Sequence, residues 1–330
     1  MFEGTDRAMI GRYLMTTAIG TTSAKTQTTA TAENSANSGM ARPSAAWATV
    51  WMLCWREWIR FFRQPNRVIG ALGQPILFWV LFGTGMHSAF RGGDQTFMAY
   101  YLPGTIALIL LFTAIFATIS IIEDRREGFL QSVLVAPVPR WTIAAGKIFG
   151  GGAIAWVQAC IFLVLAIAIG SVTLSPALGG VLLLMAISAL TLTALGVFFA
   201  WPMDSTQGFH AIMSLVLMPL WLLSGAFFPI PQAASDGPIG QAVMHWLMRC
   251  NPLSYTVAGL RRMLSEAGQV SVGQISAGQV NAGQLATSPG AEAIWIPGLA
   301  ECWIVSLVFL VLTFSAAWWI VLRPVKSDLV

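Results

Sequence analysis

Six long apolar runs constrain the fold of this chain more than any other feature of its sequence. Each run is close to the roughly 20 residues that a helix needs to cross the hydrocarbon core of a bilayer. The runs do not alternate apolar and polar residues as barrel strands do, so we predict membrane-spanning helices. The expected spans are Val68–Met86, Tyr101–Ile122, Lys147–Gly170, Leu178–Trp201, Phe209–Ile230 and Leu299–Leu322, with kinks at Pro75 and Pro219.

The composition agrees with an all-α integral membrane protein. Charged residues make up 10% of the chain and residues of the AVILMFWYC set make up 56%, whereas soluble domains carry about 25% charged residues. This balance excludes a soluble enzyme, a disordered chain and an ordinary nucleic-acid-binding protein. The four cysteines form no CxxC pair, so neither a zinc site nor a redox pair is predicted. Cys250 and Cys302 could form a disulfide or remain two free thiols.

The segments at both ends and one internal repeat fall outside the expected transmembrane domain, residues 67–323. Residues 1–46 are rich in Thr, Ser, Ala and Asn, and we expect a disordered and dispensable tail, with Met40 as an alternative start. Residues 267–290 repeat Gly-Gln-aliphatic every five residues, which favours a flexible external insertion over a short β-helix. Residues 324–330 are expected to form a cytoplasmic tail.

The distribution of lysine and arginine predicts the orientation of the spans. With the N-terminus inside, 14 of the 18 Lys and Arg residues lie on the cytoplasmic side. The external side then holds Arg91, Arg249, Arg261 and Arg262. Six spans place both termini in the cytoplasm.

Residues 47–66 are predicted to form an amphipathic helix before the first span. Its aromatic residues recur at helical spacing and its arginines recur on nearly the opposite side, which is typical of a helix in the membrane interface with its arginines toward water. Its role is either a membrane anchor alone or an anchor that also contacts a partner. The residues that define it are Trp51, Trp55, Arg56, Trp58, Arg60 and Arg63.

The cytoplasmic loop between the second and third spans, residues 123–146, is predicted to carry a short helix with an apolar stripe. Such a stripe outside the bilayer needs cover. It either folds back on the membrane or enters a groove on another protein. The candidate coupling residues are Arg126, Glu127, Gly128, Phe129, Leu130, Val133 and Leu134.

Two further helices, Met244–Arg249 and Leu253–Leu264, are expected before the last span. Both are too short to cross a bilayer, so we predict external re-entrant or interfacial helices.

Nucleotide-binding and catalytic motifs are missing from the sequence. The Gly146-Lys147 pair lacks both the upstream glycine and the Ser/Thr of a Walker A loop, and no HExxH or GxSxG occurs. The spans are predicted to hold no ionisable residue at mid-depth, with Lys147, His210 and Glu301 at span ends, which argues against ion-driven transport. Gln158, Ser188, Thr191 and Thr193 are expected to bridge helices.

Several blocks, in this order, resemble the ABC-2 type permeases of ABC exporters. They are Glu127-Gly128 with the following apolar helix, Pro137, Arg140 and Gly146-Lys147, then Leu223–Pro229, Asn251–Tyr255 and Leu260-Arg261. The resemblance covers roughly Trp47 to Arg323 and is closest to the daunorubicin-resistance and nodulation-factor export types. Phe129 departs from the family pattern, in which many members have Thr.

The resemblance implies a homodimer of this chain with two copies of a separate ATPase, in a bacterial plasma (inner) membrane. The helix before the first span and the loop helix would both contact the ATPase, which would hold ATP and Mg²⁺, so no cofactor is expected in this chain. The implied function is export of a drug, lipid or polysaccharide-like substrate, and the chain itself is not an enzyme. The alternative functions are a passive channel or a secondary carrier, and, less favoured, a membrane-embedded enzyme or an assembly scaffold.

Overall fold

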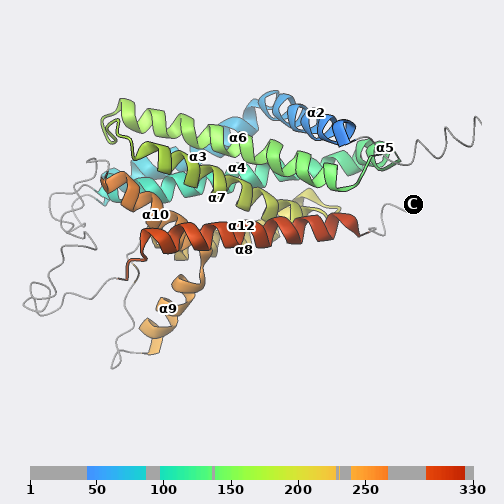
Figure 1. Cartoon of the computed structure of the whole chain (residues 1–330). Helices are drawn as coiled ribbons and strands as arrows, with labels where there is room; N and C mark the ends of the chain where they lie inside the picture. The colour runs from blue at the N-terminus through green and yellow to red at the C-terminus, as the bar shows by residue number, and fades with distance from the viewer. Residues whose placement is uncertain are drawn as a thin grey trace, which may run out of the picture.

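The computed structural model describes residues 43–86, 97–135, 138–227, 230, 239–266 and 295–323, and helices make up nearly all of this part of the chain. Six of the described helices are long and apolar enough to cross a membrane. They are α3 (Pro65–Gly85), α4 (Phe97–Arg126), α6 (Trp141–Ala168), α7 (Leu178–Ala200), α8 (Thr206–Trp221) with the π-turn η1 (Leu222–Ala226), and α12 (Leu299–Leu322). The fold is therefore the predicted all-α membrane protein, and the long helices run side by side (Figure 1).

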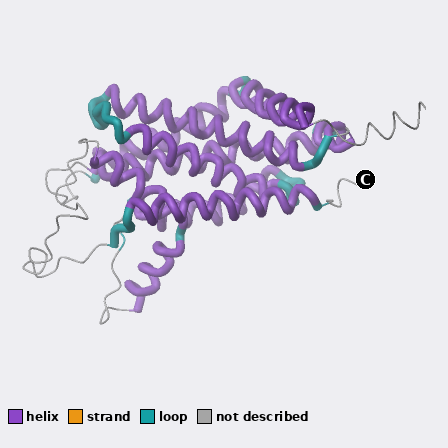
Figure 2. The backbone as a smooth tube through the Cα atoms, in the orientation of Figure 1, coloured by secondary structure: helices purple, strands orange, loops and turns teal. Residues whose placement is uncertain are grey.

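Four shorter helices flank the spans. Helix α2 (Pro43–Phe62) precedes the first span, and α5 (Phe129–Val135) lies between α4 and α6. Helices α9 (Ile239–Cys250) and α10 (Pro252–Glu266) precede α12, as the sequence predicts. Figure 2 shows that the connections between the helices are short wherever the chain is described. In Figure 1, α5 lies at one end of the bundle, while α9 and α10 lie toward the other and α9 points away from the helices.

Helix α4 forms the centre of the bundle. Every side chain from Tyr100 to Leu111 is buried, and α4 packs against α3, α6, α7, α8 and α10. Two of the predicted polar bridges are present, because Thr113 Oγ1 donates to Gln158 Oε1 at 2.8 Å and Ser188 pairs with Thr256 at 3.2 Å. Thr191 and Thr193 instead donate to carbonyls of their own helix.

The predicted span ends need correction where helices continue beyond their apolar runs. Helix α4 ends at Arg126 and not at Ile122, and α6 begins at Trp141, six residues before Lys147. The acidic and basic residues assigned to the loop therefore stand on the last turn of a helix. Pro75 and Pro219 lie inside α3 and α8 as expected, and η1 directly follows the helix that contains Pro219.

Three of the family-like blocks meet at the η1 end of the bundle. Asn251 Nδ2 donates to the Leu220 carbonyl at 2.5 Å, and Ser254 Oγ donates to the Leu223 carbonyl at 3.2 Å. Arg261 donates to the Gly225 carbonyl at 3.0 Å and lies 4.1 Å above the Tyr100 ring. These contacts fix α10 on the break between α8 and the chain that follows it.

One further prediction, the disulfide, is wrong, and several predicted segments cannot be compared with the structure. Cys250 and Cys302 are free thiols, so the disulfide is not formed. The expected tail, residues 1–46, and the expected helix, residues 47–66, have different bounds, because α2 already begins at Pro43 and ends at Phe62. Residues 1–42, the Gly-Gln repeat at 267–290 and residues 324–330 lie outside the described residues.

Candidate functional site

Helix α2 packs lengthwise along the first half of α6. Leu53 lies against Gly146, and Glu57 and Cys54 lie against Gly150. The two contacts are four residues apart on both helices, so the helices run alongside each other in the same direction. A Cβ atom on Gly150 would stand 3.1 Å from the Glu57 Cβ and 3.2 Å from the Cys54 Cα. Glycines at i and i+4 thus allow the two backbones to approach closely.

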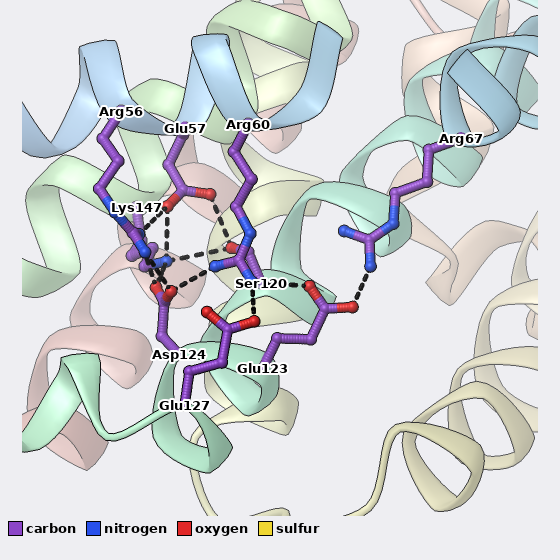
Figure 3. A network of polar contacts seen from close by, with 9 residues as sticks. All are labelled: Arg56, Glu57, Arg60, Arg67, Ser120, Glu123, Asp124, Glu127 and Lys147. Atoms are coloured by element: carbon purple, nitrogen blue, oxygen red, sulfur yellow. Dashed lines mark hydrogen bonds and ion pairs between the residues drawn. The ribbon is translucent and has the colours of Figure 1, made fainter. Parts of the chain in front are cut away.

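A fully buried carboxylate, Asp124, stands at the centre of the junction between α2, α4 and α6 (Figure 3). Arg56 donates to its two oxygens at 2.7 and 3.1 Å. Arg60 and Lys147 also donate to Asp124. Three cations from two other helices therefore share this one side chain at the last turn of α4.

Glu57 supplies the second buried carboxylate of this junction. One of its oxygens accepts from Lys147 at 2.6 Å, and the other accepts from Ser120 Oγ at 2.7 Å. Lys147 also donates to Ser120 Oγ at 3.1 Å. Glu57, Asp124 and Lys147 thus form a triangle that joins α2, α4 and α6.

A more exposed rim surrounds the triangle. Arg60 donates to Glu123 at 3.1 Å and to Glu127 at 3.0 Å, and Arg67 at the start of α3 donates to Glu123. We call the whole set the charge network. Its members are the four cations Arg56, Arg60, Arg67 and Lys147, the four carboxylates Glu57, Glu123, Asp124 and Glu127, and Ser120.

The charge network is neutral in sum, which makes its burial possible. An isolated ion in a medium of low polarity is strongly destabilised, whereas a paired and hydrogen-bonded ion is tolerated. Partial burial lowers the pKa of Arg56, but the hydrogen bond and charge of Asp124 outweigh it and leave that pKa above its ordinary value. Removing one member leaves a buried charge without its partner, so each buried member depends on the others.

The neighbouring residue on α4, Arg125, fixes the turn between α7 and α8. Its guanidinium is buried and donates to the carbonyls of Trp201 at 2.7 Å and Met203 at 3.0 Å. Arg126 donates from Nε to the Asp204 carbonyl at 3.0 Å. The last turn of α4 therefore contacts α2, α3 and α6 through its acidic residues and the α7–α8 turn through its arginines.

Gly128 makes the corner between α4 and α5. Its φ of 75° lies in the left-handed region that side chains with a Cβ rarely adopt. Directly after this corner, the Phe129 ring lies 3.6 Å from the Arg56 guanidinium carbon. Two residues predicted on separate motifs, on α2 and on α5, are thus in contact.

The structure corrects the predicted directions of both amphipathic segments. Arg56 and Arg60 point to the carboxylates of α4 and not to water, whereas Trp51 and Trp55 are exposed as expected. On α5, Leu130 is only 2% exposed and belongs to the core of its own chain, with Phe129, Val133 and Leu134 packed against it. Leu130 is therefore covered by its own chain, whereas Phe129, Val133 and Leu134 are half-buried.

The solvent-facing side of the α4–α5 corner consists of other residues. We call this the corner surface, and its members are Arg126, Glu127, Gln131, Ser132 and Val135. Val135, the last residue of α5, is apolar and 87% exposed.

Sequence reasoning missed Glu57, Ser120 and Asp124 and placed Lys147 at a span end. A usable signal was present for Glu57, which lies on the same face of α2 as the buried Val50, Leu53 and Phe61. A carboxylate on an apolar helix face indicates a buried ion pair. Asp124 gave no such signal, because it stands within a run of charges whose helical register was not visible.

Fold and site together define a multi-pass membrane protein whose interfacial helix, spans and loop helix are tied together at one end. Comparison with known families shows which class this is. Residues 48–264 match the model of the ABC-2 type transporter family. The matched residues contain the α4–α5 corner and most of α2 and α10. The chain belongs to this family, and it is the membrane subunit of an ABC transporter, which implies an ATPase partner.

Several curated proteins are similar to this chain. It is 24% identical over 227 residues to the transport permease ycf38 of Cyanophora paradoxa, covering 66% of this chain and 74% of that protein. It is 27% identical to the inner membrane transport permease YhhJ of Escherichia coli, covering 48% of this chain and 44% of YhhJ. It is 25% identical to the daunorubicin resistance ABC transporter permease protein DrrB1 of Streptomyces coeruleorubidus, covering 41% of this chain and 48% of DrrB1.

Proposed function

We propose that this chain exports a substrate across the membrane, driven by ATP that a separate ATPase hydrolyses. The charge network carries this proposal, because it links α2, α3, α4 and α6 directly to the corner that leads into α5. When the ATPase displaces the corner surface, the charge network moves the connected helices with it as a rigid body. Two copies of the chain and two ATPases complete the transporter, with the substrate path between the two permease copies.

The corner surface is the proposed contact for the ATPase. Glu127 connects it to Arg60 at 3.0 Å, and Arg126 connects it to the α7–α8 turn. Movement of this surface would therefore reach two separate parts of the bundle. Gly128 is proposed to set the angle at which α5 meets the ATPase.

Orientation follows from the same proposal, since the ATPase is cytoplasmic. The α5 end of the bundle then faces the cytoplasm, together with both termini, and α9 and α10 face outward. Cys250 on α9 is exposed, so a membrane-impermeant maleimide is expected to label it in intact cells. A Cys250→Ser variant is the control for label on Cys54, Cys160 and Cys302. Labelling of Cys250 only after permeabilisation would contradict this orientation.

Reconstitution tests the energy source. The chain, co-purified with an ATPase and placed in vesicles, is expected to move substrate only when ATP is present. Replacing the Walker A lysine of the ATPase should abolish transport while leaving the complex assembled. The substrate can be found by screening drugs, lipids and oligosaccharides for stimulation of ATP hydrolysis.

A proton-driven carrier is the second candidate, and the buried pair of Asp124 and Lys147 favours it. Paired ionisable residues within spans are typical of proton pathways. Asp124 nevertheless sits in the last turn of α4 and Lys147 in the second turn of α6, so both lie near one end of the bundle and not at mid-depth. Transport that continues without ATP and follows a pH gradient would select the carrier.

A further inference from the structure

A surface hollow lies along α2, next to the charge network. Its volume is about 540 Å³. The lining residues are Met52, Trp55, Arg56, Ile59, Arg60, Arg63, Gln64 and Glu127. The hollow is thus apolar on one side and basic on the other, with three arginines and one carboxylate.

Arg63 differs from the other two arginines of the hollow. Arg56 and Arg60 are held by Asp124, Glu123 and Glu127. Arg63 is exposed, and no carboxylate among the described residues pairs with it. Because the charge network is neutral without Arg63, this residue adds an uncompensated positive charge to the hollow.

The apolar side of the hollow is continuous with the exposed apolar face of α2. Met52 is 70% exposed and Trp55 is 57% exposed. Trp51 and Phe62 extend the same face beyond the hollow. An aromatic helix face of this kind lies at the boundary between the headgroups and the acyl chains. An occupant must therefore contact hydrocarbon-facing side chains and a free guanidinium at the same time.

We propose that the hollow is a binding site for one anionic phospholipid of the cytoplasmic leaflet. Its phosphate binds Arg63, and its glycerol and upper acyl chains lie along Met52, Trp55 and Ile59. Charge complementarity supports this occupant, because the leaflet next to a cytoplasmic helix is rich in anionic lipid. Arg60 and Glu127 both line the hollow and are hydrogen-bonded at 3.0 Å, so a bound phosphate competes with Glu127 for the same guanidinium. The choice of the cytoplasmic leaflet rests on the orientation given under the proposed function, whereas binding of the lipid does not require transport.

Native mass spectrometry of the purified full-length chain with phosphatidylglycerol or phosphatidylcholine tests the site. The wild type is expected to retain one phosphatidylglycerol that phosphatidylcholine does not replace. Arg63→Gln should weaken retention about fivefold, the effect of one arginine at a membrane surface, and Arg63→Lys should restore most of it. Glu127→Gln should strengthen retention, because it removes the competing carboxylate.

Arg323→Gln is the matched control, since Arg323 is also exposed and lies 3.5 Å from the ring centre of an exposed tryptophan, Trp319. This variant should retain lipid as the wild type does. Equal retention by Arg63→Gln and wild type, or equal retention of phosphatidylcholine, would overturn the proposal. So would displacement of the lipid by millimolar inorganic phosphate, which would indicate a site for free anions. If the bound ATPase expels the lipid and Arg63→Gln weakens the ATPase instead, the hollow belongs to the ATPase and the proposal is wrong.

Discussion

Replacing Asp124 by asparagine is expected to destabilise the protein by about 3–5 kcal/mol, the effect of removing one partner from a buried ion pair. Asp124 is fully buried and is shared by Arg56, Arg60 and Lys147. An asparagine keeps the shape but removes the charge and places an amide group among three cations. In a detergent extract, the apparent melting temperature should fall by roughly 10 °C, at about 2–4 °C per kcal/mol.

Two companion variants make this result specific. Asp204→Asn removes a carboxylate that is 66% exposed and lies 3.4 Å from Arg125, so it should shift the melting temperature little. Adding Lys147→Met to Asp124→Asn should recover part of the loss, because it removes one of the stranded cations. An unchanged melting temperature in Asp124→Asn would show that the charge network does not hold α2 in place.

Replacing Val135 by aspartate is expected to weaken binding of the ATPase by about 30-fold or more. The corner surface is the proposed contact, and a central interface residue contributes about 2 kcal/mol or more. Val135 is 87% exposed in the isolated chain, so the melting temperature of the permease should stay the same. The measurement is the dissociation constant of the purified ATPase for the permease in nanodiscs.

Leu130 provides the contrasting variant on the same short helix. At 2% exposure, Leu130 packs inside its own chain, and Leu130→Asp places a charge in that core. This variant should lower the melting temperature of the permease whether or not the ATPase is present. Equal ATPase affinity for Val135→Asp and wild type would remove α5 from the proposed contact.

The long helices could be predicted from the sequence because span length depends on the run of apolar residues alone. The same criterion placed the ends of α4 and α6 wrongly. Helices continue past the hydrocarbon layer where polar side chains find partners, and those partners are distant in sequence. Asp124 pairs with Arg56, 68 residues earlier, and with Lys147, 23 residues later. Patterns of residues within one helix cannot reveal partners that are so far apart in the sequence.

The sequence predicts both amphipathic segments, but it does not show which groups their apolar and charged faces contact. Spacing shows that the arginines of α2 share a side, and it does not show whether water or carboxylates lie there. Gly146 and Gly150 carried the missing information, because small residues four apart indicate a second helix in close contact. For α5, Leu130 of the apolar stripe packs inside its own bundle, and the Phe129 ring lies against the Arg56 guanidinium.

Photo-crosslinking from the corner surface shows whether α5 contacts the ATPase. A Val135→Cys variant that carries a cysteine-linked photo-crosslinker, in a background without the four native cysteines, should form one covalent product with the co-purified ATPase. A probe at Leu174, which is 81% exposed in the turn between α6 and α7, should form none. A product is expected from position 135 alone. An assembled complex that crosslinks from position 174 and not from position 135 would contradict the proposed contact.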